Sequence, residues 1–217
     1  MLYIVSTPIG NLKDITLRAL EILKSVALIA CEDTRHTKIL LDHYGVKTPT
    51  TSYFQHNRIT KGEYIIRRLK DGHDVALVSD AGTPGILDPG YHLINLAIKN
   101  NIAITAIPGP AAFVNALVLS GKPSHEFIFV GFLPNRSIAR KNRLKKLVGL
   151  KMTIIFYESC HRILDSLGGI LEVMGDREIV VARELTKKFE EISRDKVSNI
   201  IRHFTETKPK GEFVVII

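Results

Sequence analysis

Short apolar runs alternate along this chain with longer segments in which apolar residues recur every three or four positions. Short runs bounded by Gly, Pro or Asp are typical of buried strands, whereas the longer periodicity is typical of helices that pack one face on a sheet. The pattern predicts strands over residues 3–6, 27–30, 75–78, 102–107, 127–132, 154–157, 179–182 and 213–217. This alternation indicates an α/β protein with a largely parallel or mixed sheet.

Polar caps and glycines mark the ends of several predicted helices. The caps, each with the glycine that would end its helix, are Thr34 with Gly45, Thr60 with Gly72, and Ser137 with Gly149. A further helix begins near Pro110 and ends before Gly121. The Gly, Pro and Ser residues of segment 120–124 read as a linker, so we expect two domains, 1–120 and 121–217.

Composition narrows the class of protein. The 217 residues contain 30 Lys and Arg against 22 Asp and Glu, a net charge of +8 that favours a polyanionic partner, although proteins without one also reach it. Cys31 and Cys160 lie far apart, which indicates a reducing compartment and suggests neither a disulfide framework nor a zinc site. The start lacks the basic residues of a leader and no apolar run is long enough to span a membrane, so we expect a cytoplasmic protein.

Loops rich in Gly, Pro and acidic residues follow four of the predicted strands, at 6–11, 30–36, 79–90 and 108–112. Ligands bind beyond the carboxyl ends of strands in parallel α/β sheets, and all four loops would lie there. The loop 79–90 matches neither G-x-G-x-x-G nor G-x-x-x-x-G-K-[ST], and by itself it also fits an ordinary turn between strand and helix. Together, the four loops predict a small-molecule site in which Gly and Ala admit a flat ring or an adenosine.

These loops carry a resemblance to a known family. The segments Ser6–Leu12, Cys31–Arg35, Ser79–Ile86 and Pro108–Pro110 resemble the motif set of the tetrapyrrole methylase superfamily, and more narrowly of its ribosomal branch, the small-subunit rRNA (cytidine-2′-O)-methyltransferases. In the second half, Phe156–Ser159, Ala182–Lys187 and Gly211–Phe213 also fit. The resemblance covers essentially the whole chain, with the motifs in the expected order and spacing.

The resemblance implies two α/β domains, the first with a mostly parallel sheet and the second with a mixed sheet, that bind S-adenosylmethionine (SAM) in the cleft between them, usually as a homodimer. It implies methyl transfer to the ribose 2′-OH of a cytidine in the decoding region of small-subunit (16S) rRNA. Carried over position by position, it implies a cofactor pocket lined by Pro8, Gly10, Ser79, Asp80, Ala81, Gly82, Pro84, Ile86, Ala111, Ala112, Phe156, Tyr157 and Leu185.

Methyl transfer to a hydroxyl is an in-line displacement, to which a protein contributes alignment in a dry cleft and a group that accepts the hydroxyl proton. Among the polar residues of the matched motifs, Lys187 with a lowered pKa is the first candidate base and Glu32 the second. Arg35 would position a phosphate by bidentate contact. The alternative for Glu32 and the adjacent Asp33 is a helix N-cap or a structural ion pair.

A basic segment follows the predicted linker. Its candidate RNA contacts are Arg136, Arg140, Lys141, Arg143, Lys145 and Lys146, with no acidic residue among them. Such a helix is suited to follow a phosphate backbone, although it cannot read the sequence of bases. The alternative is a solvated helix whose apolar stripe, formed by Ile138, Leu144, Leu147 and Val148, packs on the sheet.

Two rival functions stay open. One is a superfamily member that methylates a tetrapyrrole carbon; the basic segment and the run 32–35 argue against it. The other is an RNA-binding module without catalysis, which the intact set of four loops argues against. The eight histidines show no metal-binding spacing, so we expect no metal.

Overall fold

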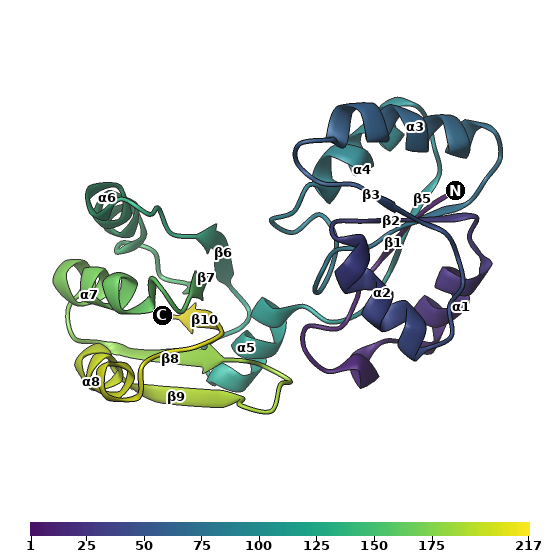
Figure 1. The fold of residues 1–217 in the computed structure, drawn as a ribbon. Coiled ribbons are helices and arrows are strands. Elements are labelled where there is room, and N and C mark those ends of the chain that lie inside the picture. Colours follow the sequence, from purple (N-terminus) through teal and green to yellow (C-terminus); the bar gives the residue numbers. More distant parts are fainter. The chain divides into compact units, whose positions relative to one another are not determined.

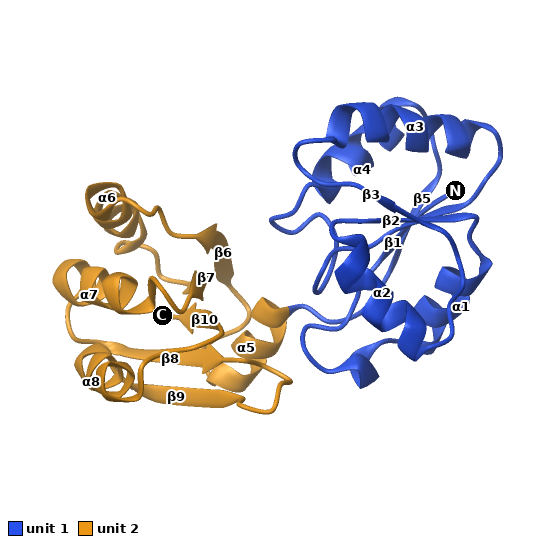
Figure 2. Cartoon of the chain, in the orientation of Figure 1, with its two compact units in different colours: residues 1–111 blue, residues 112–217 orange.

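The computed structural model describes residues 1–217 and divides into two compact units, Met1–Ala111 (unit 1) and Ala112–Ile217 (unit 2) (Figure 2). Both units are α/β, as the sequence predicts. Unit 2 begins before the expected boundary at residue 120, because the helix Ala112–Ser120 packs on the sheet of unit 2. The unit to which this apolar helix belongs is decided by the sheet that it covers. The Gly, Pro and Ser residues of segment 120–124 do not show which sheet that is.

Unit 1 is a five-stranded, all-parallel sheet in the order β3-β2-β4-β1-β5, with helices on both faces (Figure 1). Its elements are β1 (Leu2–Val5), the 3-10 helix η1 (Leu12–Asp14), α1 (Leu17–Ser25), β2 (Leu28–Cys31), α2 (Thr34–His43), β3 (Thr50–Ser52), α3 (Arg58–Lys70), β4 (Val75–Leu77), α4 (Gly90–Lys99) and β5 (Ile104–Ile107). Helices α3 and α4 share one core with the sheet, and α1 and α2 share another on the opposite face. Burial on both faces explains why these strands read as continuous apolar runs.

Unit 2 is a five-stranded mixed sheet in the order β6-β7-β10-β8-β9. Its elements are α5 (Ala112–Ser120), β6 (Phe127–Phe132), α6 (Ser137–Leu147), β7 (Thr153–Ser159), α7 (Ile163–Met174), β8 (Glu178–Arg183), β9 (Glu191–Lys196), α8 (Val197–Thr207) and β10 (Glu212–Ile216). Only β6 and β7 pair in parallel, and the remaining pairs are antiparallel. Helices α6, α7 and α8 share one hydrophobic core with the sheet, while α5 packs against β7, β9 and β10 (Figure 1).

The sequence pattern missed two strands, and all three predicted N-caps are wrong. β3 consists of Thr-Thr-Ser and β9 is mostly charged; both are edge strands, where polar residues are usual. The cap of α2 is Asp33 rather than Thr34, since the Asp33 side chain accepts a hydrogen bond from the Arg35 N–H. Asx side chains often cap two residues ahead in this way. Helix α3 is capped at Asn57, so Thr60 lies inside the helix, and α6 is capped at Arg136, so Ser137 is its first residue.

Candidate functional site

The loops after the strands of unit 1 all leave the same edge of the sheet, because every strand is parallel to its neighbours. The four predicted loops follow β1, β2, β4 and β5. A fifth, Tyr53 to Asn57, follows β3, and sequence reasoning missed it together with that strand. The carboxyl edge of this sheet is therefore the place where the predicted site residues of unit 1 converge.

Three of these loops are tied into one surface by hydrogen bonds. Thr7 and Gly82 exchange two backbone hydrogen bonds of 2.9 and 3.0 Å. The Ser6 and Thr83 hydroxyl oxygens lie 2.9 Å apart, and the Thr83 hydroxyl donates to the carbonyl of Pro110 at 3.2 Å. The loops after β1, β4 and β5 thus hold one another in place before any ligand binds.

Glycines make this close approach possible. Gly82 has a φ of +79°, a left-handed conformation that strains any residue with a side chain. Gly109 packs against Ser6 so closely that a Cβ at Gly109 would lie 2.7 Å from the Cβ of Ser6. The surface is therefore lined by backbone at these two positions, which suits a flat ligand.

The loop after β2 contains two carboxylates in different states. Asp33 accepts the Arg35 N–H at 2.8 Å and the Arg35 guanidinium Nη2 at 2.8 Å, and these bonds from Arg35 lower the pKa of Asp33 to about 2. No protein group donates a hydrogen bond to Glu32; burial raises its pKa, and the carboxylates of Asp80 and Asp88 raise it further. The cap alternative thus holds for Asp33, while Glu32 stays free to exchange a proton.

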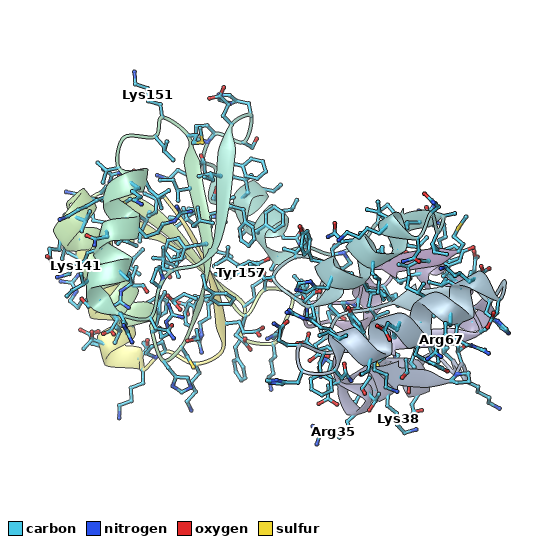
Figure 3. The ribbon with its side chains drawn as sticks, turned by 90° about the horizontal axis from the view of Figure 1, so that it is seen from above. Arg35, Lys38, Arg67, Lys141, Lys151 and Tyr157 are labelled. Atoms are coloured by element: carbon cyan, nitrogen blue, oxygen red, sulfur yellow. The ribbon has the colours of Figure 1, made fainter.

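The guanidinium of Arg35 is not placed as expected. Its side chain is 90% exposed and extends outward from unit 1 (Figure 3), and both Nε and Nη2 already bind Asp33. The bidentate face that would contact a phosphate is occupied by this carboxylate. In this arrangement Arg35 is not preorganised as a phosphate clamp, and its contact with a phosphate stays a prediction.

A cavity of about 130 Å³ opens between the loop after β1, the first turns of α2 and the start of the loop after β4. Its lining residues are Thr7, Pro8, Gly10, Leu12, His36, Thr37, Ile39, Leu40, Ser79 and Asp80. Four of them, Pro8, Gly10, Ser79 and Asp80, are predicted cofactor residues. The Asp80 carboxylate accepts the Asp33 N–H at 3.1 Å through Oδ1.

The other predicted cofactor residues of unit 1 lie on the same edge. Ala81, Gly82, Pro84 and Ile86 continue the loop after β4, and Ala111 is the last residue of unit 1. Ala112 is the first residue of α5 in unit 2.

Phe156 and Tyr157 point to opposite faces of β7 in unit 2, as successive strand residues do. Phe156 is 0% exposed within the hydrophobic core beneath α6, α7 and α8, so its ring is not available to cover a ligand as expected. Tyr157 (labelled in Figure 3) lies on the α5 face, where its hydroxyl accepts the Phe113 N–H at 3.2 Å and burial raises its pKa. Leu185 is buried.

Lys187, the first candidate base, is held by two carboxylates. Its Nζ lies 2.8 Å from Glu184 Oε1 and 2.9 Å from Glu212 Oε2. Burial alone would lower the pKa of Lys187, but the bonds to Glu184 and Glu212 outweigh it and raise the pKa. An ammonium with a raised pKa is a poor proton acceptor near neutral pH, so this pairing argues against the predicted role of Lys187 as base.

The basic helix α6 combines structural and free cations. Arg140 is only 5% exposed; its Nη1 donates to the carbonyl of Asn135 at 3.0 Å and its Nη2 lies 3.4 Å from Asp165 Oδ2. Lys141 Nζ lies 2.6 Å from Glu172 Oε2. The structure therefore corrects Arg140 from an RNA contact to a buried anchor, and it pairs Lys141 within unit 2.

The exposed cations of α6 are the ones left for a partner. Arg136, Arg143, Lys145 and Lys146 are exposed and form no ion pair. Of the alternative apolar stripe, Leu144 and Leu147 face the core, whereas Ile138 is 77% exposed and Val148 is also exposed. Figure 3 labels Lys141 on α6 and Lys151 on the segment that follows it. The helix is thus anchored by two leucines and one arginine, with a basic outer surface.

Two residues with evident roles were missing from the predictions. Asp88 accepts hydrogen bonds from the Gly85 N–H at 2.9 Å and the Gly90 N–H at 2.7 Å, which fixes the loop after β4. Its place three residues after a loop glycine and before Pro-Gly is a signal for such an Asx turn. Thr37 lines the cavity, but its position inside a helix gives no sequence signal.

No group of three or more His, Cys, Asp or Glu residues is arranged to hold a metal ion. None of the helices has the length and apolar character needed to cross a bilayer.

Sequence comparison gives one consistent family. The family described as tetrapyrrole (corrin/porphyrin) methylases matches residues 1–201. The chain is 48% identical over 219 residues to the Escherichia coli O157:H7 protein named ribosomal RNA small subunit methyltransferase I, covering all of this chain and 77% of that protein. The protein of the same name from Thermotoga maritima is 47% identical over 216 residues and is covered to 97%.

Solved structures share the fold at low sequence identity. A crystal structure of diphthine synthase superposes with a TM-score of 0.78 at 15% identity, covering 100% of this chain and 88% of that one. Uroporphyrin-III C-methyltransferase from Thermus thermophilus, in complex with S-adenosylhomocysteine, gives a TM-score of 0.66 at 15% identity, covering 99% and 96%. At such identities the likeness shows the fold alone.

Proposed function

Because this chain belongs to the tetrapyrrole methylase family, alongside the ribosomal RNA small subunit methyltransferases I, we propose that it transfers a methyl group from SAM to small-subunit rRNA. The acceptor we propose is the ribose 2′-OH of a cytidine in the decoding region. The observation that supports catalysis most directly is the set of interlocked loops at the carboxyl edge of unit 1, with the unpaired carboxylate of Glu32 on the loop after β2 at the same edge.

The residues present fit SAM. Gly82 and Gly109 expose backbone where a Cβ would strain the chain or collide with Ser6, so a flat adenosine can approach closely. We propose that the backbone of Ser79 to Ile86 holds the cofactor, with Tyr157 and Leu185 as further predicted contacts. SAM supplies an electrophilic methyl group when bound, and the interlocked loops fix its orientation.

Glu32 is the group that we propose to accept the proton of the acceptor hydroxyl. Burial and the nearby carboxylates raise its pKa, which makes it a stronger base than an ordinary glutamate, and no protein donor competes for its oxygens. It replaces Lys187, whose two carboxylate partners keep it protonated.

For RNA, we propose that the exposed cations of α6 contact phosphates. Arg143, Lys145 and Lys146 are exposed and unpaired, and unit 2 as a whole carries 18 Lys and Arg against 12 Asp and Glu. Such contacts position the RNA without reading its sequence. The homodimer also stays a proposal, supported by the exposed apolar side chains of Val114, Val118 and Leu119 on α5, and light scattering of wild type against Val118→Asp tests it.

The deciding experiment measures transfer of labelled methyl from SAM to small ribosomal subunits that lack their ribose methylations, followed by mapping of the modified nucleotide. Naked rRNA and a tetrapyrrole mixture serve as parallel acceptors. Label on one cytidine 2′-oxygen is the expected result. Label on a tetrapyrrole would overturn the RNA assignment, and RNA binding without any transfer would indicate a binding module instead.

A further inference from the structure

We propose that the cavity of unit 1 binds the pyrimidine base of the acceptor nucleotide, and that the Asp80 carboxylate selects cytosine by accepting a hydrogen bond from its exocyclic amino group. This inference rests on the proposed function, since it concerns the substrate of that reaction. The backbone of Ser79 to Ile86 stays with the cofactor, whereas the Asp80 side chain, Pro8 and Gly10, which the resemblance assigns to the cofactor, are reassigned to the acceptor base.

The size and lining of the cavity fit one small ring. Its volume is about 130 Å³, and a cavity of about 150 Å³ is known to accommodate a ring the size of benzene. Pro8, Leu12, Ile39 and Leu40 supply apolar surface for the ring faces. A pyrimidine, with one ring, matches this volume more closely than a purine with two fused rings.

The polar groups of the cavity lie at its α2 and β4 sides. Asp80 accepts a single hydrogen bond from the protein, the Asp33 N–H at 3.1 Å to Oδ1, so Oδ2 is left for a ligand. Carboxylates recognise cytosine through its amino group, because they only accept hydrogen bonds when ionised. The corresponding atom of uracil is a carbonyl oxygen, which a carboxylate repels.

A second polar group of the cavity has no strong partner. Thr37 is 3% exposed, and its hydroxyl makes no hydrogen bond to any protein nitrogen or oxygen. The Cys31 thiol beside it, whose pKa burial raises and the Thr37 hydroxyl lowers, is only a weak hydrogen-bonding group. A buried hydroxyl without a partner costs stability, and a ligand acceptor such as the cytosine O2 or N3 would satisfy it.

The substitution Asp80→Asn tests the proposal with nearly unchanged shape. The Asp33 N–H still requires an acceptor, so the amide oxygen of the substituted side chain stays on that side and its NH₂ faces the cavity. That NH₂ matches the O4 of uracil and opposes the amino group of cytosine. The variant should therefore reverse the preference of the site rather than merely weaken it.

The measurement is the affinity of the full chain for CMP, UMP and AMP, from NMR titrations to millimolar nucleotide with assigned amide signals. We expect wild type to bind CMP about tenfold more tightly than UMP, with shifts at the cavity residues, and Asp80→Asn to favour UMP. Thr37→Val should weaken CMP binding severalfold while keeping the fold, because the lost hydroxyl has only the weak Cys31 thiol as a protein partner. Asp42→Asn, on the exposed end of α2 outside the cavity, is the matched control and should leave all affinities unchanged.

Three results would overturn the inference: no shift of cavity residues with millimolar CMP, equal affinity for AMP, or an unchanged cytosine preference in Asp80→Asn. These outcomes are separate from the fate of the proposed function. SAM binding and methyl transfer by wild type are measured on the same preparation. If the wild type is active and Asp80→Asn keeps the preference for CMP, only the role of Asp80 in selecting the base is refuted. Absence of SAM binding sinks the proposed function while the nucleotide titration still reports on the cavity.

Discussion

Units 1 and 2 are both five-stranded α/β sheets, yet they use their polar residues differently. The sheet of unit 1 is all parallel, so its loops meet at one edge, where Glu32 is left without a hydrogen-bond donor. The sheet of unit 2 is mixed, and its motif carboxylates are paired inside the unit: Glu158 with Arg162, and Glu184 with Lys187. A carboxylate that the fold leaves unpaired is available for chemistry, whereas a paired one holds the chain.

The largest expected effect is the loss of methyl transfer in Glu32→Gln, which removes the unpaired carboxylate of unit 1. We expect kcat/KM for methyl transfer to fall by roughly 10³-fold, because the variant keeps the shape of the side chain but cannot accept a proton. In wild type the rate should fall as the pH drops through the raised pKa of Glu32, and this acid limb should be absent from the variant. Activity of Glu32→Gln within threefold of wild type, with Asp42→Asn as control, would remove Glu32 from the mechanism.

Substitution of two arginines of α6 in unit 2 should distinguish a buried, anchoring side chain from an exposed one. Arg140→Ala should cost about 3 kcal/mol of unfolding free energy, because it empties a buried site and strips Asn135 and Asp165 of their partner. Arg143→Ala should cost less than about 0.5 kcal/mol, as exposed substitutions usually do. Urea unfolding measures both, and equal losses would contradict the division between buried and free cations.

In unit 1, the close approach of Gly109 to Ser6 should not tolerate an added methyl group. Gly109→Ala places a Cβ 2.7 Å from that of Ser6, so we expect a loss of about 2 kcal/mol and weaker SAM binding as the loops move apart. Gly149→Ala is the matched control, since nothing lies within 4 Å of a Cβ there. Calorimetry of SAM binding beside thermal unfolding checks both effects, and unchanged SAM affinity would place the cofactor away from these loops.

The exposed, unpaired cations of α6 in unit 2 should affect the affinity for RNA rather than the stability of the fold. Removing Arg143 and Lys145 together should weaken RNA binding about tenfold and reduce the slope of log K against log salt by about two, one for each lost phosphate contact. The double variant Arg18→Ala/Lys24→Ala, on exposed positions of α1 in unit 1, should leave the slope unchanged. If both double variants behave alike, the charge of the whole chain, and not α6, drives binding.

The sequence predicted the parts of this molecule that depend on local pattern. The apolar strands and the loops after β1, β2, β4 and β5 follow from residue periodicity and from Gly and Pro placement, whereas β3 and β9 lack an apolar pattern because they are edge strands. The ionisation of Lys187 and the burial of Arg140 depend on partners far along the chain, Glu212 and Asp165, that no local pattern shows. Residue types indicated which motifs contain the candidate site residues. Which of their side chains are held in ion pairs depends on contacts that only the structure shows.

The smallest expected effect concerns Lys187, and it tests whether the paired charges of unit 2 are structural. Lys187→Met should cost about 1 kcal/mol near neutral pH and leave methyl transfer within a few-fold of wild type.

Its pH dependence is the sharper test. Burial alone would raise the pKa of Glu184, but the bonds from Lys187 and the Glu212 N–H lower this pKa overall. Glu184 therefore stabilises the fold above its pKa in the unfolded chain, and this stabilisation is lost as the pH falls through its pKa in the folded chain. Removing the ammonium should therefore flatten the acid limb of unfolding free energy, measured by urea midpoints from about pH 7 down to about pH 3. Parallel curves for the two proteins would show that Lys187 does not set the pKa of Glu184, and a large loss of methyl transfer with intact stability would return Lys187 to the reaction.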